Sequence, residues 1–232
     1  MRRTAEIADD AEETPRQAPT RPEGGPSERA EDIVRAGYNA IAVAYTEDRR
    51  EDSDDVRLLA ELARRLPRGA KVLDAGCGAG VPITRILAQR FEVTGVDFSA
   101  AQIALARENV PQARFFCRDI TQLDFPDGSF DAIVSYYAII HVRRESHRPL
   151  LENFRRMLKP GGWALLCLGA NDLPDYEDNF MGAPMYWSHY DTDTYLDMLS
   201  ECGFAVEWHR LVPDSLDTSE SVHLFVLAQR SG

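Results

Sequence analysis

The sequence predicts a three-layer α/β domain whose sheet has about seven strands, mostly parallel, with a terminal antiparallel hairpin. Two observations carry this prediction. Through the middle of the chain, short apolar runs alternate with helical patterns, and strands that are separated by helices form parallel βαβ units. At the end of the chain, residues 204–211 and 222–229 both alternate apolar and polar side chains, which is typical of an antiparallel pair.

Composition fits one domain and limits its partners. The chain has 232 residues, of which 44% are apolar, enough for a full core. The net charge of −12 would repel nucleic acid and anionic membranes, so we expect neither as a partner. No apolar run reaches the roughly 18 residues that span a bilayer, and none follows Arg2 and Arg3 as in a secretory signal. We therefore expect a cytoplasmic protein, either a monomer or a homodimer.

The cysteines predict free thiols. Cys77, Cys117, Cys167 and Cys202 are scattered, and none has a second cysteine or a histidine at ligand spacing. A disulfide framework and a zinc site are both disfavoured, and we expect no bound metal.

The N-terminal part divides into a tail and a helical segment. Residues 1–28 are acidic and proline-rich with almost no large apolar side chains, which predicts a disordered tail. Residues 29–232 are predicted to form a single domain. Its first part, about 31–66, contains two helices: one with apolar residues at helical spacing from Ile33 to Tyr45, and one from about Ser53 to Leu66.

The core, about residues 70–170, then alternates strand and helix, and glycine, proline and capping residues mark the element ends. The expected strands are 71–75, 92–97, 113–118, 130–135 and 163–168, and the expected helices are 82–89, 99–109, 144–158 and 193–202. Between the fifth strand and the last helix lies a long connection, about 169–190, rich in Asp, Pro, aromatic residues and Met. Loops of that length in a compact domain are often functional, so we expect it to build a binding pocket.

The stretch Val72 to Gly80 lies where the first strand gives way to a helix, and its glycines form a sharp turn there. Ligands of open parallel sheets bind at the carboxyl ends of the strands, so this turn predicts a small-molecule site. The spacing is not that of a dinucleotide fingerprint, because Val81 stands where the third glycine belongs, and a phosphate-binding Gly-Lys-Ser/Thr is absent. A nicotinamide oxidoreductase is therefore disfavoured.

Carboxylates at three successive strand ends suggest what the ligand is. Asp74 suits a cationic group, Asp97 is placed for the two hydroxyls of a ribose, and Asp119 can accept from an exocyclic amine. Ile120 can cover a base. Together they describe a nucleoside that bears a charged amino-acid end.

At this point the chain resembles the class I S-adenosylmethionine-dependent methyltransferases, small-molecule branch. Four ordered segments carry the resemblance: Val72 to Gly80, Gly95 to Ser99, Arg118 to Ile120, and Phe130 to Ser135 with Leu158 to Gly162. The resemblance covers about residues 35 to 230 and implies a Rossmann-like sheet, S-adenosylmethionine as cofactor, and N-terminal helices that act as a lid.

The resemblance also implies a set of cofactor contacts. The candidates are Tyr38 and Tyr45 in the lid; Asp74, Gly76, Gly78 and Gly80 at the methionine portion; Asp97 at the ribose; Phe98, Asp119 and Ile120 at the adenine; and Ser135 and Tyr136 near the sulfonium. Cys77 and Arg118 are further candidate cofactor contacts within the matching segments. Structural alternatives remain open: a surface ion pair for Arg118, a turn for Asp119, and plain core for the two lid tyrosines.

The expected reaction is methyl transfer to an O, N or C atom of a small organic acceptor, such as a natural-product intermediate of secondary metabolism. If the acceptor carries a proton, a histidine is the usual base, and His189 and His141 are the candidates. We expect Tyr137, Tyr186, Trp187 and Tyr190 to shape the acceptor pocket. The alternative is a protein that binds the cofactor but catalyses other chemistry, such as cyclisation.

Overall fold

The computed structural model describes residues 30–214 and 221–232; the predicted tail, residues 1–28, lies outside them. Seven strands form one sheet in the order β3-β2-β1-β4-β5-β9-β8, and two more form a separate small sheet. The elements are α1 (Ala30–Asp48), α2 (Asp54–Arg57), α3 (Leu59–Ala63), β1 (Lys71–Ala75), α4 (Ile83–Ala88), β2 (Glu92–Asp97), α5 (Ala100–Asn109), β3 (Arg114–Cys117), η1 (Ile120–Gln122), β4 (Phe130–Ser135), η2 (Ile139–His141), η3 (Arg144–Ser146), α6 (His147–Met157), β5 (Leu158–Gly169), β6 (Leu173–Phe180), β7 (Ala183–His189), α7 (Thr192–Glu201), β8 (Phe204–Pro213) and β9 (Val222–Arg230).

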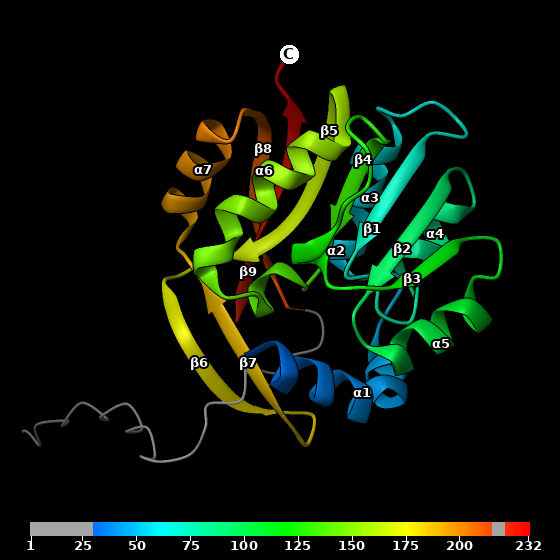
Figure 1. The fold of residues 1–232 in the computed structure, drawn as a ribbon, viewed down its shortest axis with the longest axis vertical. Helices are drawn as coiled ribbons and strands as arrows, with labels where there is room; N and C mark the ends of the chain where they lie inside the picture. The colour runs from blue at the N-terminus through cyan, green and yellow to red at the C-terminus, as the bar shows by residue number, and fades with distance from the viewer. Residues whose placement is uncertain (1–29, 215–220) are drawn as a thin grey trace, which may run out of the picture.

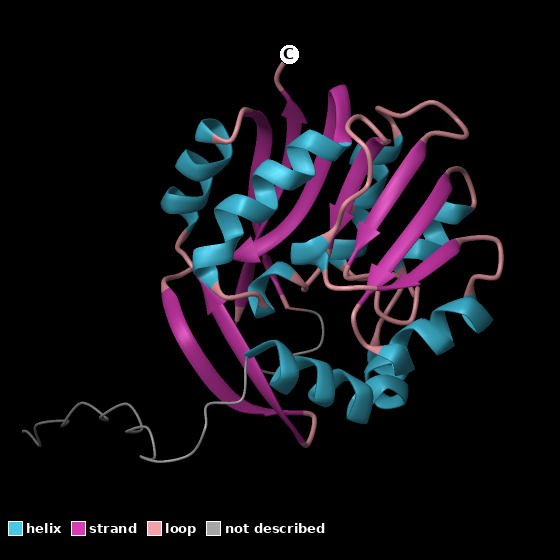
Figure 2. Cartoon of the chain, viewed as in Figure 1, coloured by secondary structure: helices cyan, strands magenta, loops and turns pink. Residues whose placement is uncertain are grey.

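The predicted fold class is confirmed. Strands β1 to β5 pair in parallel, and β9 runs antiparallel between β5 and β8. Helices α6 and α7 bury their apolar sides on one face of the sheet, whereas α2, α3 and α4 cover the other (Figures 1 and 2). The carboxyl ends of β1 and β2 point toward α1, which lies across that edge of the sheet (Figure 1). Within the described ranges, no helix combines the length and the apolar character needed to cross a bilayer.

Several element bounds differ from the prediction at their ends. The second predicted helix is two short helices, because Leu58 interrupts it as the cap between α2 and α3. The helix predicted from Arg144 begins as the 3-10 turn η3 and becomes α-helical at His147. Strand β5 starts at Leu158, earlier than predicted, and carries Gly161 at a φ of 73° within it.

The expectation of an irregular connection at 169–190 was wrong: this segment is a hairpin of β6 and β7. Strand β6 cannot be predicted from the sequence because it is acidic and exposed along nearly its whole length, so it has no apolar face. Strand β7 provides the buried side, and its Met185 and Tyr186 pack with Val34 and Ile41 of α1. The hairpin and α1 together form a second layer beyond the strand ends.

Candidate active site

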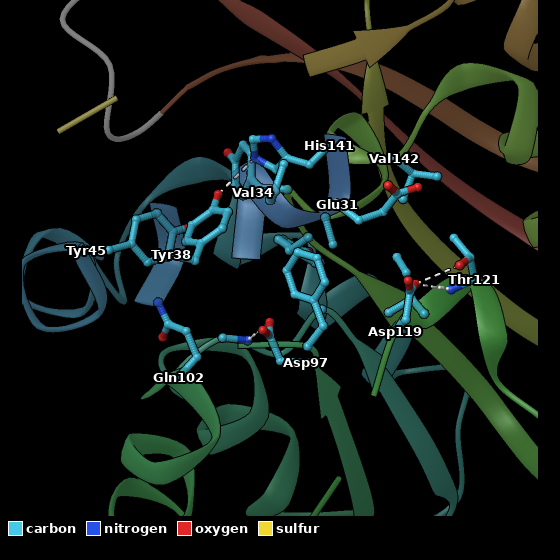
Figure 3. A pocket seen from close by; sticks show the side chains of 17 residues that line it. Glu31, Val34, Tyr38, Tyr45, Asp97, Gln102, Asp119, Thr121, His141 and Val142 are labelled. Carbon is cyan, nitrogen blue, oxygen red and sulfur yellow. Dashed lines mark hydrogen bonds between the residues drawn. The ribbon is translucent and has the colours of Figure 1, made fainter. Parts of the chain in front are cut away.

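A cavity lies where the carboxyl ends of β1, β2 and β4 meet the underside of α1 (Figure 3). It encloses about 690 Å³, including the part that is open to solvent. We call it the strand-end cavity. Its lining residues are Glu31, Val34, Tyr38, Tyr45, Gly76, Gly78, Asp97, Phe98, Gln102, Asp119, Ile120, Thr121, Tyr136, Tyr137, Ala138, His141 and Val142.

The glycine-rich turn forms a floor without side chains. Gly76 has a φ of 84° and Gly78 a φ of 51°, which L-residues with a Cβ rarely adopt. A Cβ on Gly76 would lie 2.1 Å from Cβ of Ala138. The turn is fixed by two backbone N–H groups, of Gly76 and Cys77, that donate to the carbonyl of Val96 at 2.7 and 2.9 Å. A ligand can therefore approach the main chain closely here.

Asp97 stands at the end of β2 with its carboxylate toward the strand-end cavity (Figure 3). Its Oδ2 accepts from the backbone N–H of Gly78 at 3.0 Å, and its Oδ1 accepts from that of Ser99 at 2.9 Å. Burial raises the pKa of Asp97 to about 6. Each carboxylate oxygen can accept more than one hydrogen bond, so both retain capacity for donors of a ligand. Ser99, not Asp97, caps α5, through its Oγ and the N–H of Gln102.

Gln102 is a candidate residue that the sequence analysis missed. It is 1% exposed and lines the strand-end cavity, and neither its amide nitrogen nor its amide oxygen has a hydrogen-bond partner. A buried amide without a hydrogen-bond partner destabilises the folded protein by on the order of 1–3 kcal/mol. A polar ligand that hydrogen-bonds to Gln102 would remove this penalty. Its position in the first turn of α5, three residues after the cap, could have drawn attention to it.

The other end of the strand-end cavity is lined by three residues that were predicted to surround the adenine: Asp119, Ile120 and Phe98. Oδ1 of Asp119 accepts from the backbone N–H and from Oγ1 of Thr121, at 2.8 and 2.7 Å, and so begins the η1 turn (Figure 3). The guanidinium of Arg35 lies 5.2 Å from the centre of the Phe98 ring. An apolar side chain, an aromatic ring and a carboxylate thus converge at one place.

A smaller hollow adjoins the glycine turn and contains Asp74 and Arg49. Asp74 is 1% exposed, its Oδ2 accepts from Oγ1 of Thr84 at 2.5 Å, and burial raises its pKa to about 7. Arg49 forms a buried ion pair with Asp55 at 3.2 Å and lies 4.9 Å from the centre of the Tyr137 ring. Asp74 was predicted from the sequence but Arg49 was not, because its buried charge is evident only once α2 packs beside the end of α1.

Besides Asp74, four other predicted cofactor residues lie outside the lining of the strand-end cavity because other contacts occupy them. Cys77 is packed among Ile103 and Phe115, and it borders only the smaller hollow. Gly80 faces α5, where a Cβ would lie 3.2 Å from Val110. Arg118 is exposed and forms an ion pair with Asp124 at 2.9 Å. Ser135 is buried, and its Oγ donates to the carbonyl of Ala75 at 2.8 Å.

A second, larger cavity lies between α1, the hairpin and the start of β9. We call it the hairpin cavity; it encloses about 1570 Å³, including its open side. Its lining residues are Tyr38, Tyr45, Tyr137, Ile140, His141, Asn171, Leu173, Tyr176, Asp178, Asn179, Phe180, Met181, Trp187, His189, Asp214, Ser221, Val222 and His223. Tyr38, Tyr45, Tyr137 and His141 also line the strand-end cavity, so these four form a shared wall.

His141 is held from both sides in this wall. Its Nδ1–H donates to the carbonyl of Tyr186 at 2.6 Å, because a carbonyl can only accept. Its Nε2 therefore accepts from the hydroxyl of Tyr38, at 2.9 Å (Figure 3). Burial lowers the pKa of His141 to about 4. The imidazole is thus neutral near pH 7, and its lone pair is already engaged.

His189 lies at the end of β7 in the hairpin cavity. Its Nδ1–H donates to the carbonyl of Asn171 at 2.6 Å, which leaves the lone pair on Nε2. Burial lowers the pKa of His189. Of the predicted acceptor-pocket residues, Trp187 and Tyr137 line this cavity. Tyr186 and Tyr190 do not: the hydroxyl of Tyr186 donates to Asp175, and Tyr190 packs on His147 and Tyr195.

His223 is a second residue of the site that was not among the candidates predicted from the sequence. It lines the hairpin cavity and pairs with Asp214 at 3.3 Å between Nε2 and Oδ2. Its ring meets that of Tyr137 edge to face at 5.1 Å. Only the pairing of β8 with β9 brings these residues here, so no local signal marks them. In the described part of the chain, no three metal-ligating side chains converge as a metal ion would require.

Comparisons with known proteins agree with this geometry. Residues 72–162 match a family model described as a methyltransferase domain. Over 55% of its length the chain is 35% identical to the O-methyltransferase rstn1 of Aspergillus nomiae, and it spans 61% of that relative.

Solved structures with low sequence identity share the fold. The 1,6-didemethyltoxoflavin-N1-methyltransferase of Burkholderia thailandensis, with bound S-adenosylhomocysteine, matches 91% of this chain and 94% of its own at a TM-score of 0.64 and 22% identity. The cyclase SpnF matches 84% of this chain and 95% of its own at a TM-score of 0.64 and 17% identity. At such identities the likeness concerns the fold.

Proposed function

The chain carries a class I S-adenosylmethionine-dependent methyltransferase domain, and on that premise we propose that it methylates a small organic molecule held in the hairpin cavity. The observation that carries this proposal is the shared wall: Tyr38, Tyr45, Tyr137 and His141 border both cavities. A donor in one cavity and an acceptor in the other would meet there. Catalysis of such a transfer is mainly proximity and orientation of the two reacting atoms.

The strand-end cavity suits the cofactor, S-adenosylmethionine, which supplies an electrophilic methyl group on a sulfonium sulfur. We assign the ribose hydroxyls to Asp97, whose carboxylate can accept from both. The unpartnered amide of Gln102, close by, would gain a polar partner. The adenine would lie between Ile120 and Phe98, with Asp119 at its edge.

The smaller hollow suits the amino-acid end of the cofactor. Asp74 offers a buried carboxylate for the ammonium group, and the guanidinium of Arg49 lies on the same side for the carboxylate group. The floor of Gly76 and Gly78 leaves room for the chain that joins this end to the ribose. Opposite charges at both ends of the amino-acid group fix its orientation.

Within the hairpin cavity, His189 is better suited than His141 to take a proton from the acceptor. The lone pair of His141 is used by Tyr38, whereas the hydrogen bond from His189 to Asn171 directs the lone pair to Nε2. We therefore propose His189 as the general base and His141 as a positioning residue that links α1 to β7.

For the acceptor, we propose a natural-product intermediate that is methylated on oxygen, nitrogen or carbon. The net charge of −12 supports a small molecule over nucleic acid. The names of the two methyltransferases described above, an O-methyltransferase and a didemethyltoxoflavin methyltransferase, support the same class.

The likeness to the cyclase SpnF supports a second candidate function, cyclisation, in which the cofactor would be bound but not consumed. The test is to incubate the protein with S-adenosylmethionine and candidate acceptors and to count S-adenosylhomocysteine against product. Methyl transfer predicts one S-adenosylhomocysteine for each product molecule. A product that forms without S-adenosylhomocysteine would favour cyclase-like chemistry, and failure to bind the cofactor would contradict both functions.

A further inference from the structure

Five aromatic rings form a closed circuit of contacts at the hairpin cavity. Tyr38 meets Tyr45 at 5.3 Å between ring centres, Tyr45 meets Phe180 at 6.3 Å, and Phe180 meets Trp187 at 6.2 Å. Trp187 meets His141 at 5.6 Å, and His141 returns to Tyr38 at 5.4 Å. All five line the hairpin cavity, and three of them belong to the shared wall. We call this circuit the aromatic belt.

The aromatic belt is assembled from four elements that are distant in the sequence. Two tyrosines come from α1, Phe180 from β6, Trp187 from β7 and His141 from η2. Four of the rings, all except His141, are only partly buried, so their surfaces are not used up by packing in the core. Aromatic faces and edges attract another ring by about 0.5–1.5 kcal/mol for each contact, beyond the area they bury.

Asp178 and Asp214 are the carboxylates among the described lining residues of the hairpin cavity, and a hydrogen bond to each leaves its negative charge in place. Asp178 accepts from the hydroxyl of Tyr176 at 2.6 Å, and Asp214 pairs with His223. Burial lowers the pKa values of His141 and His189, so both imidazoles are neutral near pH 7. Asp178 is exposed, so solvent screens its charge, whereas the aromatic belt and the two neutral imidazoles offer an uncharged surface to a ligand.

We propose that the acceptor is a planar aromatic molecule of no net charge that bears a hydroxyl or a ring N–H. This inference rests on the proposed function and specifies its substrate class. The acceptor ring packs against the aromatic belt, which places its reacting atom at the shared wall. As the new bond to the methyl carbon forms from the electron pair of that oxygen or nitrogen, its proton passes to Nε2 of His189. The C–S bond breaks with its electron pair on sulfur, so the products are the methylated acceptor and S-adenosylhomocysteine.

The test measures binding to protein saturated with S-adenosylhomocysteine, using 2-naphthol as the probe. Three matched compounds are titrated beside it: decahydro-2-naphthol, which is saturated; 2-naphthoate, an anion; and 2-naphthylmethylamine, a cation. We expect 2-naphthol to bind about tenfold more tightly than decahydro-2-naphthol, as two or three ring contacts would provide. We also expect it to bind about tenfold more tightly than the two charged compounds, which make the same ring contacts but must lose hydration of their charge at an uncharged surface.

Substitutions locate the binding. Trp187→Leu removes a member of the aromatic belt. It should reduce the preference for 2-naphthol over decahydro-2-naphthol to less than about threefold. Trp208→Leu, a matched change on β8 outside the cavity, should leave it unchanged. Should Trp187→Leu fail to fold, Tyr176→Ala is the second variant, because Tyr176 is 39% exposed and its ring centre lies 6.0 Å from that of Trp187.

The contrary results distinguish failure of this inference from failure of the proposed function. Equal binding of the saturated compound, tighter binding of either charged compound, or no measurable binding of 2-naphthol would overturn the inference. These results would leave the proposed function standing, provided that S-adenosylhomocysteine itself binds. S-adenosylhomocysteine is therefore titrated by itself first, and if it does not bind, the proposed function fails rather than this inference.

Discussion

The floor of the strand-end cavity and the wall of the hairpin cavity are built in different ways. The floor consists of short runs of residues at the ends of β1 and β2, such as Gly76, Gly78 and Asp97, and hydrogen bonds from backbone N–H groups fix them. The wall consists of side chains such as Tyr38 and Trp187, which α1 and the hairpin bring together from opposite ends of the chain. The floor is therefore specified locally, whereas the wall depends on tertiary packing.

This difference separates binding of the cofactor from choice of the acceptor. Changes in the floor should affect the affinity for the cofactor, and changes in the wall should affect turnover and acceptor preference. A variant that changes the other property would contradict the division. The following substitutions test it, beginning with the largest expected effect.

Gly76→Ala should abolish cofactor binding. The new Cβ would lie 2.1 Å from Cβ of Ala138, and the φ of 84° adds backbone strain of roughly 1–2 kcal/mol. Calorimetric titration with S-adenosylmethionine should show a loss of affinity of about a hundredfold or more. Gly69→Ala is the matched control, because Gly69 has a φ of 74° but open space around its Cβ position. If the two variants bind equally well, the close approach to Ala138 is not what matters.

His189→Ala should lower turnover by roughly a hundredfold and leave the affinity for S-adenosylmethionine unchanged, because it removes a proton acceptor from the wall only. The measurement is steady-state formation of S-adenosylhomocysteine with an acceptor identified by the screen. His209→Ala, on β8 and outside both cavities, is the control and should behave as the unsubstituted protein. Normal turnover in His189→Ala would remove His189 as the base.

Asp97→Asn should weaken cofactor binding by roughly thirtyfold, or about 2 kcal/mol, since a neutral amide replaces the charged acceptor of the ribose hydroxyls. Asp124→Asn changes an exposed carboxylate in the same way and should have no effect. Because the pKa of Asp97 is raised to about 6 in the protein, affinity should also decline as the pH falls below about 6. An unaltered affinity in Asp97→Asn would exclude the ribose assignment.

Asp74→Asn should stabilise the cofactor-free protein at pH 8 by roughly 1–2 kcal/mol. The pKa of Asp74 is about 7 when folded, against 3.8 for an ordinary Asp, so the folded chain holds a proton that the unfolded chain loses. Stability contributed by this proton is present below about pH 4 and is lost as the pH rises to about 7. Urea unfolding at several pH values would show the slope in the unsubstituted protein and a flatter profile in the variant. Equal slopes would contradict the burial of this charge.

Tyr186→Phe should change turnover by less than about twofold. Its hydroxyl donates to Asp175 outside both cavities, and the contact of this residue with His141 uses the backbone carbonyl, which Phe retains. The same assay as for His189→Ala applies. A large loss of turnover would mean that the hydroxyl of Tyr186 reaches the acceptor after all.

The sequence predicted the floor of the site well and its wall poorly, for a physical reason. A glycine turn and a strand-end carboxylate are local signals, so Gly76, Gly78, Asp97 and Ile120 were found and lie together. Even there, neighbours such as Cys77 and Gly80 face α5, because the direction of a residue within a turn depends on what packs beside it.

The wall was harder to predict because its members share no local pattern. Strand β6 is exposed and acidic, so nothing in it predicts a strand until β7 pairs with it. His223 reaches the hairpin cavity through its place in the sheet. In the strand-end cavity, Gln102 was equally hard to predict, because it is notable only for lacking partners once α5 is packed. Trp187 was named because it lies in the long connection, and the structure puts it in the lining of the hairpin cavity; membership of that connection could not show that Tyr186 faces α1.

The most direct measurement is a crystal structure of the protein with S-adenosylhomocysteine. We predict that the ribose hydroxyls lie within hydrogen-bonding distance of the Asp97 carboxylate, that the amino-acid end lies beside Asp74 and Arg49, and that the sulfur faces the shared wall. A sulfur that faces away from Tyr38 and His141, or a ligand bound elsewhere, would contradict transfer between the two cavities.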